Sequence, residues 1–175
     1  MRRALLTILL AALAAGAAYQ LVIRDTTVEP RLSVPRATAT IGSGTDAVAV
    51  GADGTILAWL PLPEEVQLPQ LPLVEVPSRR RLGGTMLQQA RVLGAAPATL
   101  RPYIAGSYYG ESGVDVKLRS GIELRFGDPS RATAKWKAAA AVLADPSLEA
   151  LDYVDLRAPN RPAVSGSGHT LPPVP

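Results

Sequence analysis

Few residues of this 175-residue chain have the types and spacing that catalysis requires. Glu64 and Glu65 could form a carboxylate pair for general acid–base chemistry, although adjacent acidic residues in a proline-rich stretch are more typical of a solvated loop. His169 is the only histidine, and its surroundings are rich in proline, glycine and serine, so it is a poor candidate for a catalytic base. The chain has no cysteine, which excludes thiol nucleophiles, disulfides and thiolate metal sites.

Two further groups of residues could bind ions. Gly51–Gly54 (GADG) could belong to a calcium loop, but further oxygen ligands at alternating positions are missing, and a tight turn is the simpler interpretation. Arg79–Arg81 could contact anionic lipid headgroups or a cell-wall polymer, whereas a solvated run of charge is the ordinary interpretation. No phosphate-binding loop, nucleophile elbow or metalloprotease motif occurs. We therefore expect no enzyme, no cofactor and no metal site, and the sequence favours a tethered interaction domain.

The formal net charge of +3 does not indicate nucleic-acid binding. Arg2 and Arg3 supply two of the 18 basic residues, so the rest of the chain sets 16 basic residues against 15 acidic ones. A nearly neutral domain lacks the basic surface that binding to phosphate backbones requires.

Residues 4–23 form an apolar run without charge, long enough for a helix to cross about 30 Å of hydrocarbon. Arg2 and Arg3 precede this run, so we expect residues 1–3 to stay in the cytoplasm and the rest of the chain to lie outside it. A cleaved signal peptide is the alternative, because Ala4–Ala12 could be its apolar core and Ala15–Ala17 offers small residues for cleavage. Both interpretations export the remainder.

The exported part divides into three segments. Residues 24–36 are expected to form an extended spacer, residues 37–164 a folded domain, and residues 165–175 (SGSGHTLPPVP) a disordered tail. In the folded domain, strands are predicted at residues 37–41, 47–50, 55–60, 103–109 and 151–157. The prolines between residues 61 and 77 exclude a helix or a central strand there.

Residues 114–126 predict a β-hairpin whose register follows from its charges. A three-residue loop, Arg119–Gly121, separates apolar from charged residues on opposite faces, whereas a two-residue turn would mix them. The three-residue loop predicts these facing pairs: Val114 with Phe126, Val116 with Leu124, Leu118 with Ile122, Asp115 with Arg125, and Lys117 with Glu123. One face of this sheet is therefore buried and the other is solvated.

Two helices complete the domain. Thr85 and Gln88 have the spacing of a capping box for a helix at residues 82–95. Asp128 and Pro129 predict the start of a second helix, with Lys135 and Lys137 outside its buried stripe. The expected fold class is α+β: an N-terminal transmembrane helix, then a mostly antiparallel β-sheet domain with two helices packed on one face.

The order of several motifs resembles the β domain of the bacterial cell-division family FtsQ/DivIB. The motifs are Gly121–Gly127 (GIELRFG), the helix that bears Lys135, Tyr153–Arg157 (YVDLR) and Pro159–Pro162 (PNRP). The resemblance covers about residues 37–165. Only residues 24–36 stand where the family has its POTRA domain, so we expect that module to be absent.

The resemblance implies a non-catalytic scaffold of the divisome, held by a single span in the plasma membrane at the division septum. It also implies partners of the FtsB/FtsL type, bound outside the membrane when they add a strand to a C-terminal sheet edge. Pro159 and Pro162 lack backbone N–H groups and could shorten that edge, in which case the partner could lie along Val154. The residues implied in partner binding are Tyr153, Val154, Asp155, Leu156, Arg157, Ala158, Asn160, Arg161, Ala163 and Val164. An envelope-binding or structural domain unrelated to division, anchored or secreted, is the alternative function.

Overall fold

The computed structural model describes residues 36–63, 67–72 and 76–172. The predicted anchor at residues 4–23, its signal-peptide alternative and the spacer up to residue 35 lie outside the described residues. Within the described ranges, no helix has the length and apolar character needed to cross a membrane.

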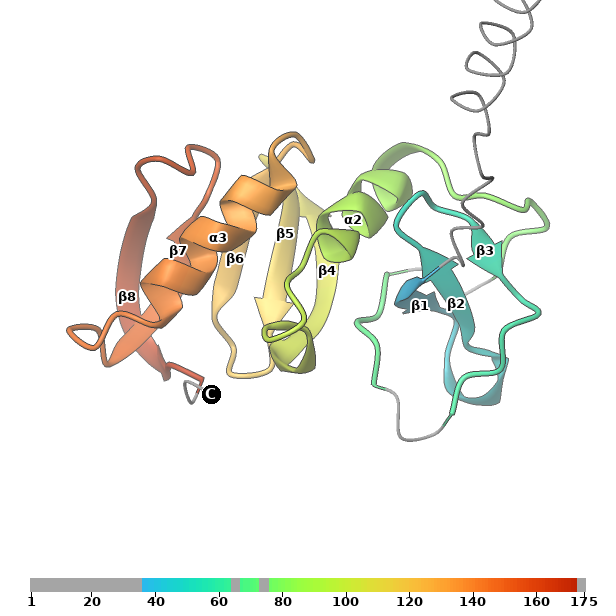
Figure 1. Ribbon diagram of the computed structural model, residues 1–175, viewed down its shortest axis with the longest axis horizontal. Coiled ribbons are helices and arrows are strands. Elements are labelled where there is room, and N and C mark those ends of the chain that lie inside the picture. The colour runs from blue at the N-terminus through green and yellow to red at the C-terminus, as the bar shows by residue number, and fades with distance from the viewer. Residues whose placement is uncertain (1–35, 64–66, 73–75, 173–175) are drawn as a thin grey trace, which may run out of the picture. The chain divides into compact units, whose positions relative to one another are not determined.

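A five-stranded sheet forms the C-terminal part of the domain (Figure 1). Its strands lie side by side in chain order: β4 (Ile104–Gly110), β5 (Gly113–Leu118), β6 (Glu123–Gly127), β7 (Ala150–Asp155) and β8 (Ala163–Thr170). All neighbouring strands are antiparallel except β6 and β7, which are parallel because a helix connects them. The expectation of a mostly antiparallel sheet is confirmed.

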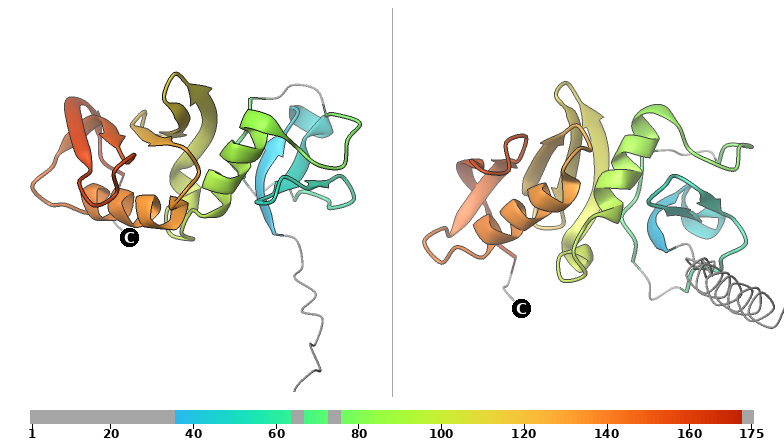
Figure 2. Two further views of the ribbon diagram at one scale, coloured as in Figure 1. Left: turned by 90° about the horizontal axis from the view of Figure 1, so that it is seen from above. Right: turned by 45° about the horizontal axis from the view of Figure 1, so that its top comes forward.

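Two helices, α2 (Gly84–Gly94) and α3 (Ala132–Leu143), cover one face of this sheet (Figure 2). Trp136 of α3 is buried, and its ring lies 4.8 Å from the ring of Phe126 between their centroids. The Trp136 indole N–H also donates to the Val92 carbonyl of α2 at 2.7 Å, which ties the two helices together. This layered arrangement confirms the α+β class.

A second, three-stranded antiparallel sheet contains β1 (Ala37–Ile41), β2 (Val48–Gly51) and β3 (Ile56–Leu57). Short 3₁₀ helices occupy Gly44–Asp46 and Arg101–Tyr103. In the described part of the proline-rich stretch, the Gln70 N–H donates to the Ala105 carbonyl at 3.3 Å. Gln70 forms single bridges to Thr40 of β1 and Gly106 of β4, so this stretch links the two sheets without forming a regular strand.

The predicted hairpin loop is confirmed. The Gly121 N–H donates to the Leu118 carbonyl at 3.0 Å, and Gly121 has a φ of +101°. Asp115 faces Arg125, Val116 faces Leu124 and Lys117 faces Glu123, as expected. One pair differs, because a bulge beside Asp115 moves Val114 opposite Gly127 in place of Phe126.

Both predicted helix starts are wrong in detail. The helix α2 begins at Gly84 after Gly83 as N-cap, so Thr85 lies inside the helix and does not cap it. The helix α3 begins at Ala132, because the Asp128 carboxylate accepts the Ser130 N–H at 2.6 Å and closes a turn before the helix. Arg131, with a φ of +54°, then leads into the first helical turn.

Lys135 was expected outside the buried stripe of α3, but its side chain is buried. Its Nζ donates to the carbonyl oxygens of Phe126 and Asp128, at 2.9 and 2.8 Å. The Phe126 carbonyl belongs to the next-to-last residue of β6, and the Asp128 carbonyl directly follows β6, so the lysine joins α3 to the end of this strand. Lys137 is exposed, as expected.

The disordered tail expected at residues 165–175 is wrong for residues 165–170, which belong to β8. Ser165 pairs with Tyr153, and Thr170 pairs with Ala150, so the open side of β7 is covered by this segment. Unpaired backbone groups of a sheet edge favour such pairing even where side chains are small and polar. Residues 173–175 lie outside the described residues.

Candidate partner-binding edge

The strand β8 is the last of the five-stranded sheet, and all eight of its residues are exposed. The strand β7 lies between β6 and β8, so the backbone of Tyr153–Asp155 is paired on both sides. A partner strand therefore cannot pair directly along Val154, whose side chain is also buried. Of the residues implied in partner binding, Ala163 and Val164 lie on the edge itself.

The opposite edge of the sheet, along β4, is partly occupied. The Gln70 N–H donates to Ala105, and the Ser107 N–H donates to the Gln70 carbonyl, both at 3.3 Å. The backbone approach is close, since a Cβ at Gly106 would lie 2.7 Å from the Gln70 carbonyl oxygen. Of the two described edges, β8 is the one without such a segment beside it.

The outward-facing groups of β8 follow from the pairing of β7. The Leu156 N–H donates to the Arg125 carbonyl of β6 at 2.9 Å. The backbone N–H and C=O groups of even-numbered residues along β7 therefore point to β6, and those of odd-numbered residues point to β8. Val164 lies opposite Val154, an even-numbered residue. Its N–H and C=O must then point away from β7, and Thr170, opposite Ala150, has the same orientation.

Asp152 interrupts the register in the middle of β8. The strand pairing shifts between Leu151 and Tyr153, and the Gly168 N–H donates to Asp152 Oδ1 at 2.9 Å. A Cβ at Gly166, whose φ is +86°, would lie 1.9 Å from Asp152 Oδ2. The glycines of the SGSG stretch therefore allow β8 to bend around this carboxylate.

The connection from β7 to β8 contains the remaining predicted residues. Leu156 is buried, while the Arg161 N–H donates to the Ala158 carbonyl at 2.9 Å and closes a turn. Asn160 Oδ1 accepts a hydrogen bond from Arg131 at 3.2 Å. Pro159 and Pro162 precede Ala163, the first residue of β8, and so they do not interrupt the edge strand.

Charged and aromatic side chains cross the sheet face that the helices leave uncovered. The Arg125 guanidinium lies 3.8 Å from the centre of the Tyr153 ring, and its Nε donates to Glu123 at 2.6 Å. Arg157 donates to the Asp155 carboxylate at 3.0 Å through Nε, and these hydrogen bonds hold the pKa of Asp155 below its usual value. Arg125 and Arg157 are thus each paired with a carboxylate of the same face.

Other candidate residues do not form a site. Glu64 and Glu65 lie outside the described residues. Asp53 of the GADG turn accepts hydrogen bonds from Thr55 and from Arg81, and the described residues contain no group of His, Cys, Asp or Glu that could hold a metal. His169 lies in β8 with its ring against Gly121.

The family model described as "Cell division protein FtsQ/DivIB, C-terminal" matches residues 39–157. The chain belongs to the FtsQ/DivIB family. The match spans the strands from β1 to β7 and both helices, and it ends before β8. No match was found among curated proteins. Membership of this family assigns the chain a role in cell division, within a family of non-enzymatic proteins.

Sequence reasoning missed Ser165–Thr170 and Asp152 as parts of the edge. Alternating serine and glycine is typical of a linker, and the need for glycine became evident only with the Asp152 carboxylate beside it. One signal was available, since the open side of an alternating strand at 151–157 is a template for pairing with a later segment of the chain.

Proposed function

We propose that this chain is a membrane-anchored, non-catalytic scaffold of the divisome, which binds FtsB/FtsL-type partners through β8. The observation that carries the proposal is the open backbone edge of β8, in a chain of a cell-division family. An added strand would receive backbone hydrogen bonds from this edge and side-chain contacts from alternate residues.

Several features of the edge support strand addition. The outward N–H and C=O of Val164 lie in the segment Ala163–Ser165, which pairs regularly with β7. Val164 is 41% exposed and gives this segment an apolar side chain that a partner residue could cover. The bulge at Asp152 bends the next residues, so the proposed docking segment is short and centred on Val164.

The proposed anchor is the apolar run at residues 4–23, preceded by Arg2 and Arg3. A single span with a cytoplasmic N-terminus would place the described domain outside the membrane, at the septum where the partners act. Membership of a division family favours this function over an envelope domain unrelated to division.

Amide hydrogen exchange of the full chain in lipid nanodiscs, with and without an FtsB/FtsL-type complex from the same bacterium, tests the proposal. We expect the Val164 amide to exchange at least about tenfold more slowly in the complex, because a partner carbonyl would accept its N–H. Amides of the turn between β4 and β5 serve as the internal control and should not change. A complex that forms without slower exchange at residues 163–165 would refute the edge as the binding site.

A further inference from the structure

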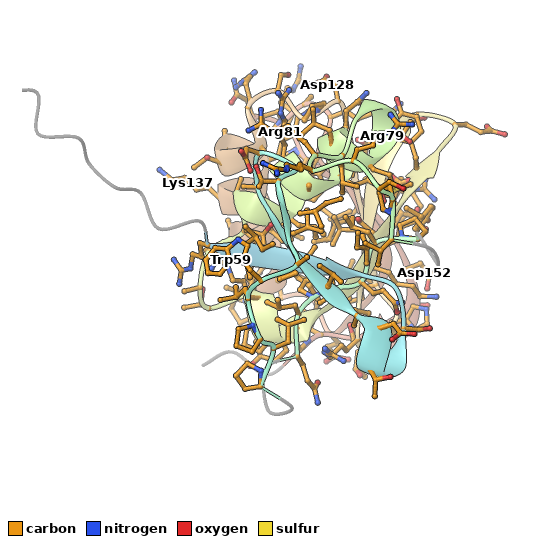
Figure 3. The ribbon with its side chains drawn as sticks, turned by 90° about the vertical axis from the view of Figure 1, so that its right-hand side faces the viewer. Trp59, Arg79, Arg81, Asp128, Lys137 and Asp152 are labelled. Atoms are coloured by element: carbon orange, nitrogen blue, oxygen red, sulfur yellow. The ribbon has the colours of Figure 1, made fainter. Side chains whose placement is uncertain are left out.

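Six arginines lie on chain segments that adjoin the three-stranded sheet, and we call them the basic rim. The residues of the basic rim are Arg36, Arg79, Arg80, Arg81, Arg91 and Arg101. Arg80 and Arg81 extend the small sheet, since the Ile56 N–H donates to the Arg80 carbonyl at 2.9 Å and Thr55 forms a bridge to Arg81. Figure 3, which looks onto the β1–β3 side of the domain, shows Arg79 and Arg81 near the top of the view.

The other arginines come from the residue before β1, from α2 and from the segment after α2, where Arg101 Nε donates to the Ala96 carbonyl at 3.0 Å. Arg36 directly precedes β1, and a Cβ at Gly51 would lie 3.8 Å from its carbonyl oxygen. Arg91 lies in the last turn of α2, which contacts the β2–β3 turn so closely that a Cβ at Gly94 would lie 2.2 Å from the Ala52 Cβ. The pKa of Arg101 is lowered by burial and by the charge of Arg36, so these two guanidinium groups repel each other.

Few of these charges are neutralised by the protein. Arg81 pairs with Asp53 at 2.9 Å, and Asp53 is already bonded to the Thr55 N–H and hydroxyl. Within the described ranges, Arg36, Arg79, Arg80 and Arg91 are exposed and form no salt bridge. Clustering unpaired cations is unfavourable for folding, which points to an external anion as their partner.

We propose that the basic rim binds the anionic headgroups of the lipid bilayer that holds the N-terminal anchor. The proposal rests on the anchoring part of the proposed function. Arg36 is joined to the predicted span by residues 24–35, which reach at most about 40 Å when fully extended. This tether keeps the rim close to the membrane surface, so weak contacts with single headgroups add together.

The arginines fit phosphate groups, and an exposed tryptophan favours a lipid surface as their source. Guanidinium groups pair with phosphate oxygens through two parallel hydrogen bonds, and Arg79 and Arg80 are exposed, adjacent in sequence and without a salt bridge to any other described residue. Trp59 is 66% exposed and lies lower on the same side of the domain in Figure 3. An exposed amphipathic ring is typical of residues at the membrane–water interface.

A single fluorescent label tests the proposal, because the chain has no cysteine. Ser78→Cys places a unique thiol beside Arg79 on an exposed residue, where it can carry a dye. The labelled full chain is reconstituted into vesicles of phosphatidylcholine alone or with phosphatidylglycerol, each containing headgroup-quencher lipid. Arg79→Ser/Arg80→Ser is the test variant, and Lys117→Ser/Lys137→Ser, two exposed lysines outside the rim, is the matched control.

We expect strong quenching in phosphatidylglycerol vesicles. The equilibrium constant for docking of the labelled domain on the vesicle surface should be lower by on the order of 30-fold in the arginine variant. The lysine control should dock as the unmodified chain does. Equal quenching in both vesicle types would overturn the proposal, as would an arginine variant that docks normally. If the labelled chain shows no quenching in phosphatidylglycerol vesicles but binds a soluble cell-wall polyanion through Arg79 and Arg80, the rim belongs to that polymer and the proposal is overturned.

Alkaline extraction of the same vesicles reports separately on the anchor. A chain released by extraction would contradict the proposed span at residues 4–23. In that case the labelled chain can be added to the two vesicle types from solution. The comparison between them then still shows whether the basic rim binds anionic headgroups.

Discussion

The Gly168 backbone N–H donates a hydrogen bond to the Asp152 carboxylate, with 2.9 Å between the nitrogen and Oδ1. A side-chain oxygen of β7 thus takes the place of a backbone carbonyl at the one position where the ladder between β7 and β8 shifts. This contact fixes where the regular part of the edge ends, and it explains why a stretch that resembles a linker forms a strand.

Gly166→Ala should loosen β8. The new Cβ would lie 1.9 Å from Asp152 Oδ2 and 2.4 Å from Asp152 Cβ, so rotation of the carboxylate alone cannot relieve the clash. The φ of +86° adds about 1–2 kcal/mol of backbone strain for a residue other than glycine. We expect amides of residues 165–170 to lose protection in hydrogen exchange while the helices keep theirs. Gly83→Ala, with no atom within 4 Å of the new Cβ, is the control and should leave the exchange unchanged.

Lys135→Met should destabilise the domain by about 2–4 kcal/mol. The substitution removes the donor for the Phe126 and Asp128 carbonyls, and the bond that is lost at Phe126 is buried. Lys137→Met, on the exposed side of the same helix, should stay within about 0.5 kcal/mol of the unmodified chain. Urea unfolding of the full chain in detergent, followed by circular dichroism, compares the two. Equal stability of both variants would contradict the structural role of Lys135.

Asp115→Asn should increase stability at neutral pH. Burial, and then the charge of Glu123, raise the pKa of Asp115 from 3.8 to about 6. The folded state therefore binds more protons than the unfolded state between about pH 4 and 6, and its stability decreases as the pH rises through that window. Asparagine carries no charge, so the variant should lack this decrease and gain up to about 3 kcal/mol above pH 7.

Asp155→Asn should change the stability at neutral pH in the opposite direction and serves as the control. Hydrogen bonds from Arg157 lower the pKa of Asp155, so this carboxylate stabilises the folded state above its usual pKa and loses that effect as the pH falls. The variant should be less stable than the unmodified chain at pH 7 and similar to it near pH 2. Urea unfolding at pH 2, 4, 5, 6 and 7 separates the two aspartates; a steeper decrease between pH 4 and 7 for Asp115→Asn than for the unmodified chain would contradict the assignment.

The hairpin was predictable from the sequence because its evidence is local. Asp115 opposite Arg125 and Lys117 opposite Glu123 define one register, and Gly121 supplies the loop residue that this register needs. The family resemblance was visible for a similar reason, since the order of short motifs survives without knowledge of any contact. The α+β class followed from the spacing of apolar residues along each element.

The errors concern residues whose role depends on a distant neighbour. Lys135 is buried because it donates to two carbonyls at the end of β6, and Ser165–Thr170 form a strand because β7 has an open side. Asp128 closes a turn with Ser130 and therefore does not cap the helix that its type predicts. Residue type and spacing alone do not contain these requirements, which arise only when separate elements pack.

The backbone edge at Val164 is the central feature of the proposed function, and a proline substitution tests it. Val164→Pro removes the outward N–H that a partner strand would use, and the ladder to β7 should remain because this N–H points away from it. Val164→Thr is the matched control, since it changes the side chain and keeps the N–H. The measurement is the affinity of the full chain in nanodiscs for an FtsB/FtsL-type complex. We expect Val164→Pro to bind at least about tenfold more weakly while Val164→Thr binds nearly as the unmodified chain does; a folded Val164→Pro chain that binds with unchanged affinity would contradict the proposed edge.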